Sequence, residues 1–137
     1  MPLAIRMGWR KASDIRAWEL SMELEEQFTA VLAREPASRD RRFCDDARDA
    51  AASTARNIAE GFGRYGDVEF ARFVNIAYAS HLETQTNLQI ALSRSFVSQT
   101  EFDRLWVISE EAKATTLGLL TTLKQRIAAR RRSRKRT

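Results

Sequence analysis

Six basic side chains lie within the last eight residues of this 137-residue chain: Arg130, Arg131, Arg132, Arg134, Lys135 and Arg136. Guanidinium and ammonium groups bind phosphate oxygens without reading base sequence. This C-terminal basic segment therefore predicts sequence-independent binding of RNA or DNA. The alternative is a solvated terminus with no partner, because runs of like charge repel one another and are often unstructured.

The positive charge of the chain is confined to this segment. The formal net charge is +5, but residues 1–129 carry 17 basic side chains against 18 acidic ones, a balance of about −1. A basic groove formed by the body of the protein is therefore not expected, and any phosphate binding must depend on the C-terminus.

Catalytic side chains are not indicated by residue type or spacing. The one histidine, His81, has Tyr78 three residues before it, so the Glu-x-x-His motif of bundle metal sites is missing. The one cysteine, Cys44, is followed by Asp45 and Asp46, whose charges disfavour a thiolate. We expect no catalytic residues, no metal and no cofactor, hence a protein that is not an enzyme, and we expect His81 to be a packed or capping side chain.

Four helices are expected to position these residues. No proline follows Pro36, and apolar residues recur at helical spacing through four segments. We predict an N-terminal extension over 1–12, helices over about 13–33, 40–62, 68–94 and 99–129, and a disordered basic tail over 130–137. Ser13 or Asp14 is expected to cap the first helix, and Ser98 or Thr100 the fourth. The predicted fold is all-α, an antiparallel up-down four-helix bundle.

Membrane insertion and secretion are not expected. No apolar stretch reaches the roughly 18 residues that cross a bilayer, and the first eleven residues are too weakly apolar for a secretory signal. We therefore expect a cytoplasmic protein without a membrane partner.

Polar residues form columns on the two middle helices. The first column is Asp46, Ser53, Asn57 and Glu60, and the second is Ile76, Ser80, Glu83, Asn87 and Ile90. If the helices are antiparallel about a turn near residue 64, Arg48 can reach Glu83, and Arg72 can reach Asn57 or Glu60. Three interpretations stay open: an interhelical polar network or solvated face, a subunit interface, and a catalytic or metal site.

A family resemblance is carried by the turn between these two helices. Residues 57–64 read Asn-Ile-Ala-Glu-Gly-Phe-Gly-Arg, and Glu69-Phe70, Ile76-Ala77, Ser80 and Glu83 follow. This pattern resembles the hallmark of the bacterial four-helix-bundle family first named from proteins encoded in 23S rRNA intervening sequences, which is similar in turn to the accessory variability determinant of diversity-generating retroelements. The resemblance covers residues 13–127 and includes Trp18. Where relatives commonly have a second arginine in the second helix, this chain has Asp49, which weakens any nucleic-acid role of that helix.

The resemblance implies a barrel-like homo-oligomer, often a pentamer, with no known enzymatic activity and a role in binding nucleic acid or a reverse transcriptase. It marks eight residues as the family motif and interhelical polar network: Arg48, Asn57, Glu60, Gly61, Arg64, Arg72, Ser80 and Glu83. In a pentamer the basic segments would together carry about 30 positive charges, which would give strong, salt-sensitive phosphate binding. The alternative function is a protein-interaction module for a polypeptide partner, reverse transcriptase-like or toxin-like, with no nucleic-acid role.

Overall fold

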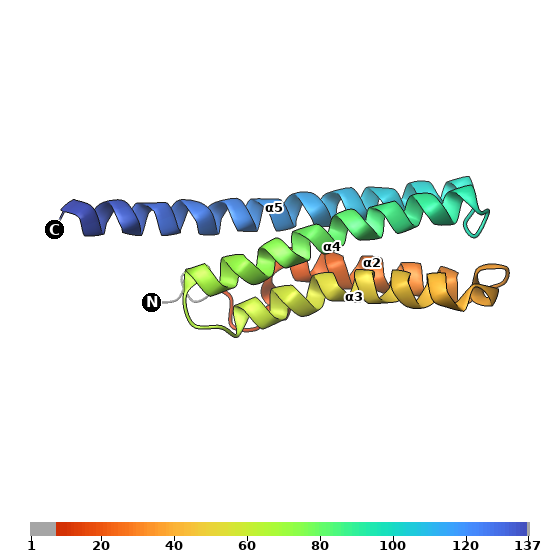
Figure 1. The fold of residues 1–137 in the computed structure, drawn as a ribbon, viewed down its shortest axis with the longest axis horizontal. Helices are drawn as coiled ribbons and strands as arrows, with labels where there is room; N and C mark the ends of the chain where they lie inside the picture. The colour runs from red at the N-terminus through yellow and green to blue at the C-terminus, as the bar shows by residue number, and fades with distance from the viewer. Residues whose placement is uncertain (1–7, 137) are drawn as a thin grey trace.

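The computed structural model describes residues 8–136, and it contains four α-helices and two short 3₁₀ turns. The helices are α2 (Arg16–Leu32), α3 (Arg41–Phe62), α4 (Asp67–Ser93) and α5 (Gln99–Arg136), and the 3₁₀ turns are η1 (Ala12–Asp14) and η2 (Ala37–Arg39) (Figure 1). No strand occurs among the described residues. The prediction of an all-α, four-helix protein is confirmed. Of the expected N-terminal extension, residues 1–7 lie outside the described residues, as does Thr137.

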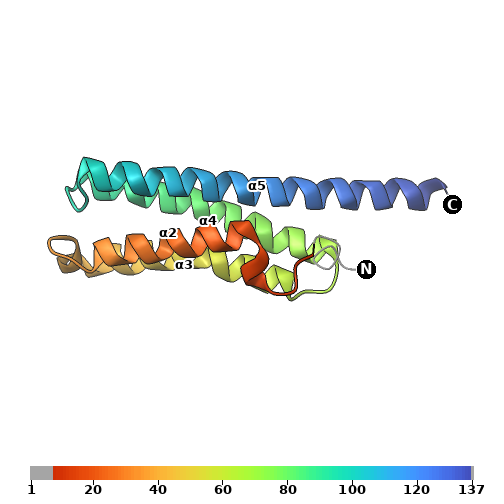
Figure 2. The same cartoon turned by 180° about the vertical axis from the view of Figure 1, so that it is seen from behind.

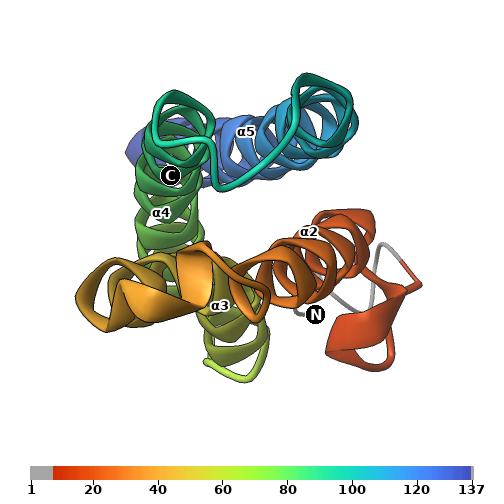
Figure 3. The same cartoon turned by 90° about the vertical axis from the view of Figure 1, so that its right-hand side faces the viewer.

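The four helices contact one another in a closed cycle. Helix α2 packs on α3, α3 on α4, α4 on α5, and α5 back on α2. Seen along their length, the helices surround a common centre (Figure 3). Short loops connect each helix to the next, and Gly66, with φ of 98°, makes the turn that leads into α4.

Two apolar clusters occupy the two ends of the bundle interior. One is built around Phe28, Leu88 and Leu105, and the other around Ile58 and Leu123, all of which are fully buried. Burial of aliphatic and aromatic side chains of this kind is the main source of stability in a helical bundle. The clusters explain why apolar periodicity in the sequence is sufficient to locate the helices.

A polar layer lies between the two apolar clusters, with His81 at its centre. The His81 side chain is fully buried, and its Nε2 lies 3.0 Å from Thr116 Oγ1 and 3.3 Å from Ser21 Oγ. Both hydroxyls donate to backbone carbonyls of their own helices, to Ala112 O at 2.8 Å and Ala17 O at 2.6 Å. The imidazole must therefore donate from Nε2. Among the described atoms Nδ1 has no partner.

Burial keeps His81 neutral. Desolvation lowers the pKa of His81 to about 4, and the Lys113 ammonium adds to the effect by repelling a second positive charge. The imidazolium form would also place an extra N–H on Nδ1, where no acceptor lies. His81 is thus a packed core side chain, and the prediction of such a role is confirmed.

The two predicted N-caps have different outcomes. Helix α5 begins at a reciprocal cap in which Glu101 N donates to Ser98 Oγ and Ser98 N donates to Glu101 Oε1. The prediction for Ser98 is therefore confirmed. The prediction of a cap at Ser13 or Asp14 is wrong, because the N-cap of α2 is Ile15. Asp14 instead accepts the backbone N–H groups of Arg10 and Lys11 within the preceding 3₁₀ turn.

Helix α5 ends later in the chain than the sequence pattern predicts. The sequence pattern predicts that the helix ends near residue 129 and that a disordered tail follows, but α5 continues to Arg136. Arginine, lysine and alanine are strong helix formers, and no glycine or proline follows Gly118. Basic residues in the last turn also interact favourably with the negative end of the helix dipole. These two effects outweigh the repulsion between neighbouring cations.

Candidate nucleic-acid interface

Basic side chains gather at one end of the bundle. The C-terminal part of α5 extends beyond the ends of the other three helices (Figures 1 and 2), so the basic segment projects from the body. Lys124 and Arg126 precede it on the same helix. Arg64, from the turn after α3, and Arg72, from the first turns of α4, lie at the same end. Basic residues that are far apart in the sequence thus lie at the same end of the bundle.

Asp67, the first residue of α4, anchors this part of α5. Its carboxylate is only 3% exposed and lies 3.2 Å from Arg126 Nε and 3.4 Å from Arg130 Nη2. One carboxylate therefore holds two guanidinium groups. Arg130 has a structural partner, whereas Arg131 and Arg132 lie beyond this contact. Sequence reasoning missed Asp67, because nothing local indicates a partner 59 residues away.

Arg64 and Arg72 stack on the same aromatic ring. Arg64 Cζ lies 5.2 Å and Arg72 Cζ 4.5 Å from the centre of the Phe73 ring. Each arginine also pairs with a glutamate a few positions before it, Arg64 with Glu60 at 2.7 Å and Arg72 with Glu69 at 3.2 Å. The predicted contact of Arg72 with Asn57 or Glu60 is therefore wrong. Glu60 is paired locally and is exposed, so it is not part of a buried network.

An exposed aromatic residue follows Arg64 directly in the chain. Tyr65 lies in the turn between α3 and α4 and is 94% exposed. An aromatic ring beside guanidinium groups can stack on a nucleic-acid base while the cations hold the backbone. Tyr65 was not predicted as a functional residue from the sequence. The signal that could have indicated it is its position directly after Arg64 in a glycine-rich turn, where an aromatic side chain is expected to be exposed.

The predicted polar columns meet at only one point. Ser53 Oγ and Ser80 Oγ lie 2.9 Å apart between α3 and α4, and Asn57 Nδ2 donates to Ser53 Oγ at 2.9 Å. Ser80 is buried, so this small group is an interhelical network.

The predicted contact between Arg48 and Glu83 is wrong. Arg48 pairs on its own helix with Asp45, at 3.7 Å. Glu83 is exposed to solvent on α4. Among residues 8–136 no group of three or more histidine, cysteine, aspartate or glutamate side chains could hold a metal ion.

Gly61 has a packing role. A Cβ added at Gly61 would lie 2.8 Å from Phe70 Cδ1 and 2.9 Å from Phe73 Cβ, both on α4. Real Cβ atoms do not approach other carbons so closely, so only glycine permits this separation between α3 and α4. The motif residue thus sets the position of Phe73, and with it the position of the two arginines that stack on that ring.

Cys44 shows no sign of a reactive thiol. Its side chain is buried, its Sγ lies 3.1 Å from Ala37 O, and burial raises the pKa of the thiol. Within the described part of the chain, no helix is both long enough and apolar enough to cross a membrane.

Comparison with known proteins identifies the family. A family model described as 23S rRNA-intervening sequence protein matches residues 13–117. No curated protein matches the chain. The matched region contains α2, α3, α4 and the first half of α5, and includes the Asn57–Arg64 motif; the basic segment lies beyond it. Because the match covers well over half of the chain, this protein belongs to the family of 23S rRNA-intervening sequence proteins.

Proposed function

We propose that this protein is a non-catalytic scaffold that binds RNA or DNA through the cationic end of its bundle. In this proposal the antiparallel up-down bundle assembles into a barrel-like homopentamer, which displays five copies of the basic segment. The observation that carries the proposal is the projection of an exposed basic helix from the end of the bundle that also holds Arg64, Tyr65 and Arg72.

The helical form of the basic segment favours sequence-independent contact. At 3.6 residues per turn, its six cations are spread over about 240° of the helix circumference. Such a helix can present cations to phosphates from several directions, and no single face is shaped to read base edges. In an oligomer, several copies of the basic segment would contact one nucleic acid at the same time, and their individually weak contacts would together give strong binding.

Neutralising the segment tests the proposal. Complete deletion is a poor test because it removes Arg130 and leaves the buried Asp67 carboxylate with one partner. The better variant keeps Arg130 and combines Arg131→Gln, Arg132→Gln, Lys135→Gln and Arg136→Gln. We expect the slope of log K against log salt to fall by about 3, and affinity for a single-stranded RNA of mixed sequence to fall about 1,000-fold at about 0.1 M salt. Fluorescence anisotropy across a salt series measures both quantities.

A matched control distinguishes local contacts from total charge. Four substitutions at the opposite end of the bundle remove the same charge: Arg39→Gln, Arg41→Gln, Arg42→Gln and Arg104→Gln. This control should keep most of the affinity and the original salt slope. Equal losses in the two variants would show that only net charge matters, and an unchanged slope in the first variant would refute the role of the basic segment.

Tyr65 gives a second test of nucleic-acid binding. Tyr65→Ala is expected to reduce RNA affinity about fivefold without changing the salt slope, because base stacking involves no counterion release. Tyr65→Phe keeps the aromatic ring and should bind as the unaltered protein does. Loss of affinity in both variants would instead point to the hydroxyl group, and no loss in either would remove Tyr65 from the interface.

The oligomeric part of the proposal is tested by absolute mass. Multi-angle light scattering after high-salt and nuclease treatment is expected to give about five times the chain mass of 15.7 kDa, and the mass should rise when RNA is added. A mass of one chain that does not change with RNA would contradict both assembly and multivalent binding.

A polypeptide-binding module with no nucleic-acid role is the second candidate function. It is favoured by an apolar groove between α4 and α5, whose floor offers little to a phosphate. If the protein binds no RNA after nuclease treatment but still binds a defined peptide, this second function replaces the first.

A further inference from the structure

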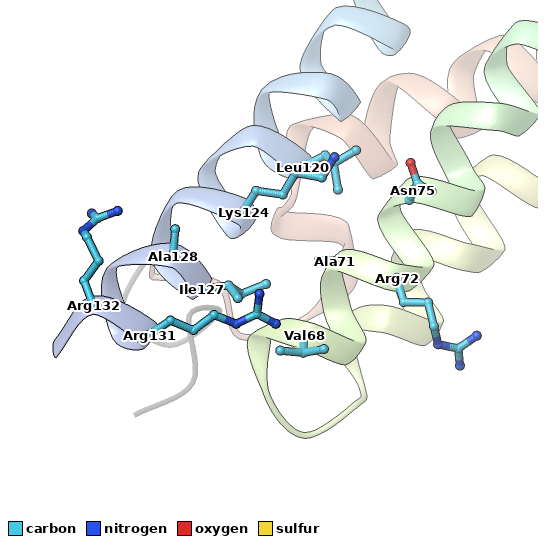
Figure 4. Close-up of a pocket in the computed structure, with 10 residues that line it drawn as sticks. All are labelled: Val68, Ala71, Arg72, Asn75, Leu120, Lys124, Ile127, Ala128, Arg131 and Arg132. Carbon is cyan, nitrogen blue, oxygen red and sulfur yellow. The ribbon is translucent and has the colours of Figure 1, made fainter. Parts of the chain in front are cut away.

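A groove runs between the first turns of α4 and the last turns of α5 (Figure 4). Its volume is about 580 Å³. The floor is aliphatic and includes Val68, Leu120 and Ile127, and Val68 remains 59% exposed. An exposed valine next to further apolar surface indicates an unpartnered apolar strip.

Cations border this floor. Lys124, Arg131 and Arg132 from α5 and Arg72 from α4 line the groove, and no acidic residue does. Figure 4 shows Arg131 extended toward Val68, whereas Arg72 and Arg132 point outward on opposite sides. Of these four, only Arg72 has a carboxylate partner within ion-pair distance among residues 8–136. The groove therefore combines an apolar floor with positive charge that its own lining does not neutralise.

The groove has the length and shape of a site for a short helix. At 1.5 Å per residue, Val68 to Asn75 spans about 10 Å on α4, and Leu120 to Arg131 spans about 16 Å on α5. These lengths correspond to two to three turns of a third helix lying between the two. Helix-in-groove binding buries side chains at i, i+3, i+4 and i+7 against such an apolar strip.

The chemistry of the lining favours a polypeptide over a nucleic acid. No aromatic residue lines the groove, so no base can stack there, and an aliphatic floor offers no hydrogen bonds to base edges. Leucine, isoleucine and valine side chains would instead bury Val68 and Ile127. Glutamate or aspartate on the flanks of the same helix would pair with Lys124 and Arg131.

We propose that the groove between α4 and α5 is a docking site for an acidic amphipathic helix of a partner polypeptide. This site is separate from the projecting basic helix beyond it, although Arg131 and Arg132 border both. The inference does not depend on nucleic-acid binding, and each can fail without the other.

The test uses a defined probe and the full chain. The probe is a fluorescein-labelled peptide of about 14 residues, which spans about 21 Å as a helix, with leucines at i, i+3, i+4 and i+7 and glutamates on both flanks. A scrambled peptide has the same composition but no apolar face. We expect the amphipathic peptide to bind the nuclease-treated protein at least tenfold more tightly than the scrambled one. Equal binding of the two peptides would overturn the proposal, because charge alone would then explain it.

Val68→Ser removes the exposed part of the floor without changing charge. It is expected to weaken binding of the amphipathic peptide about fivefold and to leave RNA affinity unchanged. The matched control is Val107→Ser, since Val107 is 66% exposed on α5 outside the groove and should not affect the peptide. Unchanged peptide binding by Val68→Ser would overturn the proposal. A parallel loss of RNA affinity in Val68→Ser would also overturn it, because nucleic acid would then be the occupant of the groove. A change in the oligomeric mass of Val68→Ser would overturn it as well, because the occupant would then be a second copy of this chain.

Discussion

Lowering the pH from 7.5 to 5 is expected to destabilise this protein by about 2 kcal/mol through His81 alone, and by about 3 kcal/mol below pH 4. The pKa of His81 is about 4 in the folded protein and near 6.5 in the unfolded chain. Between these values the unfolded state binds the extra proton, so stability is full above pH 6.5 and is lost as the pH falls toward 4. The measurement is the free energy of unfolding by urea, at fixed protein concentration, across this pH range.

The charged groups around His81 support this direction. Lys113 on α5 is the cation that acts on it and disfavours a second positive charge. The polar groups of α2 and α5 within hydrogen-bond distance of the imidazole are the hydroxyls of Ser21 and Thr116. In the described part of the chain, no carboxylate lies close enough to raise the pKa of His81 against burial and the charge of Lys113. Glu101 acts in a different window, because its hydrogen bond from Arg34 lowers the pKa of its carboxyl group to about 2.

The substitution His81→Leu should remove this pH dependence. The side chain that replaces it has no proton to gain, and Ser21 and Thr116 keep their backbone acceptors. His81 is the only histidine, so no other imidazole can supply the same slope. Thr84→Val is the control, since Thr84 is equally buried and bonds only to Ser80 O. It should keep the slope, and a slope that persists in His81→Leu would show that another group titrates.

The helices and the family motif could be predicted from the sequence because they depend on local patterns. Apolar periodicity and the lack of proline after Pro36 locate all four helices, and residue type marks Ser98 and Thr100 as candidate caps of the fourth, of which Ser98 is the cap in the structure. Each of these features is determined by residues within a few positions of one another.

Features that depend on the register between helices could not be predicted in the same way. The structure places Ser53 opposite Ser80, whereas Arg48 pairs with Asp45 on its own helix instead of reaching Glu83. The pairing of Asp67 with Arg126 and Arg130 depends on where α5 passes α4, which no local pattern encodes. The charge of the C-terminal segment suggests disorder, but helix propensity and the helix dipole stabilise the helix by more than charge repulsion destabilises it.

The packing of α3 on α4 gives a second prediction of large effect, since Gly61→Ala is expected to destabilise the protein by about 2 kcal/mol. The added Cβ would clash with Phe70 and Phe73, and Phe73 Cβ is fixed to its backbone, so the two helices must separate. Near the end of α3 an alanine gains little helix propensity to offset this cost.

Gly118→Ala provides the opposite case in the same chain. Gly118 lies inside α5, and nothing is within 4 Å of an added Cβ, so alanine there should stabilise the protein by about 1 kcal/mol. Urea unfolding of both variants therefore measures two changes in the free energy of unfolding. Their signs are expected to differ because only Gly61 is in close contact with another helix. If Gly61→Ala proved as stable as the unaltered protein, the approach of α3 to α4 would not depend on glycine, and the position of Phe73 between Arg64 and Arg72 would need another cause.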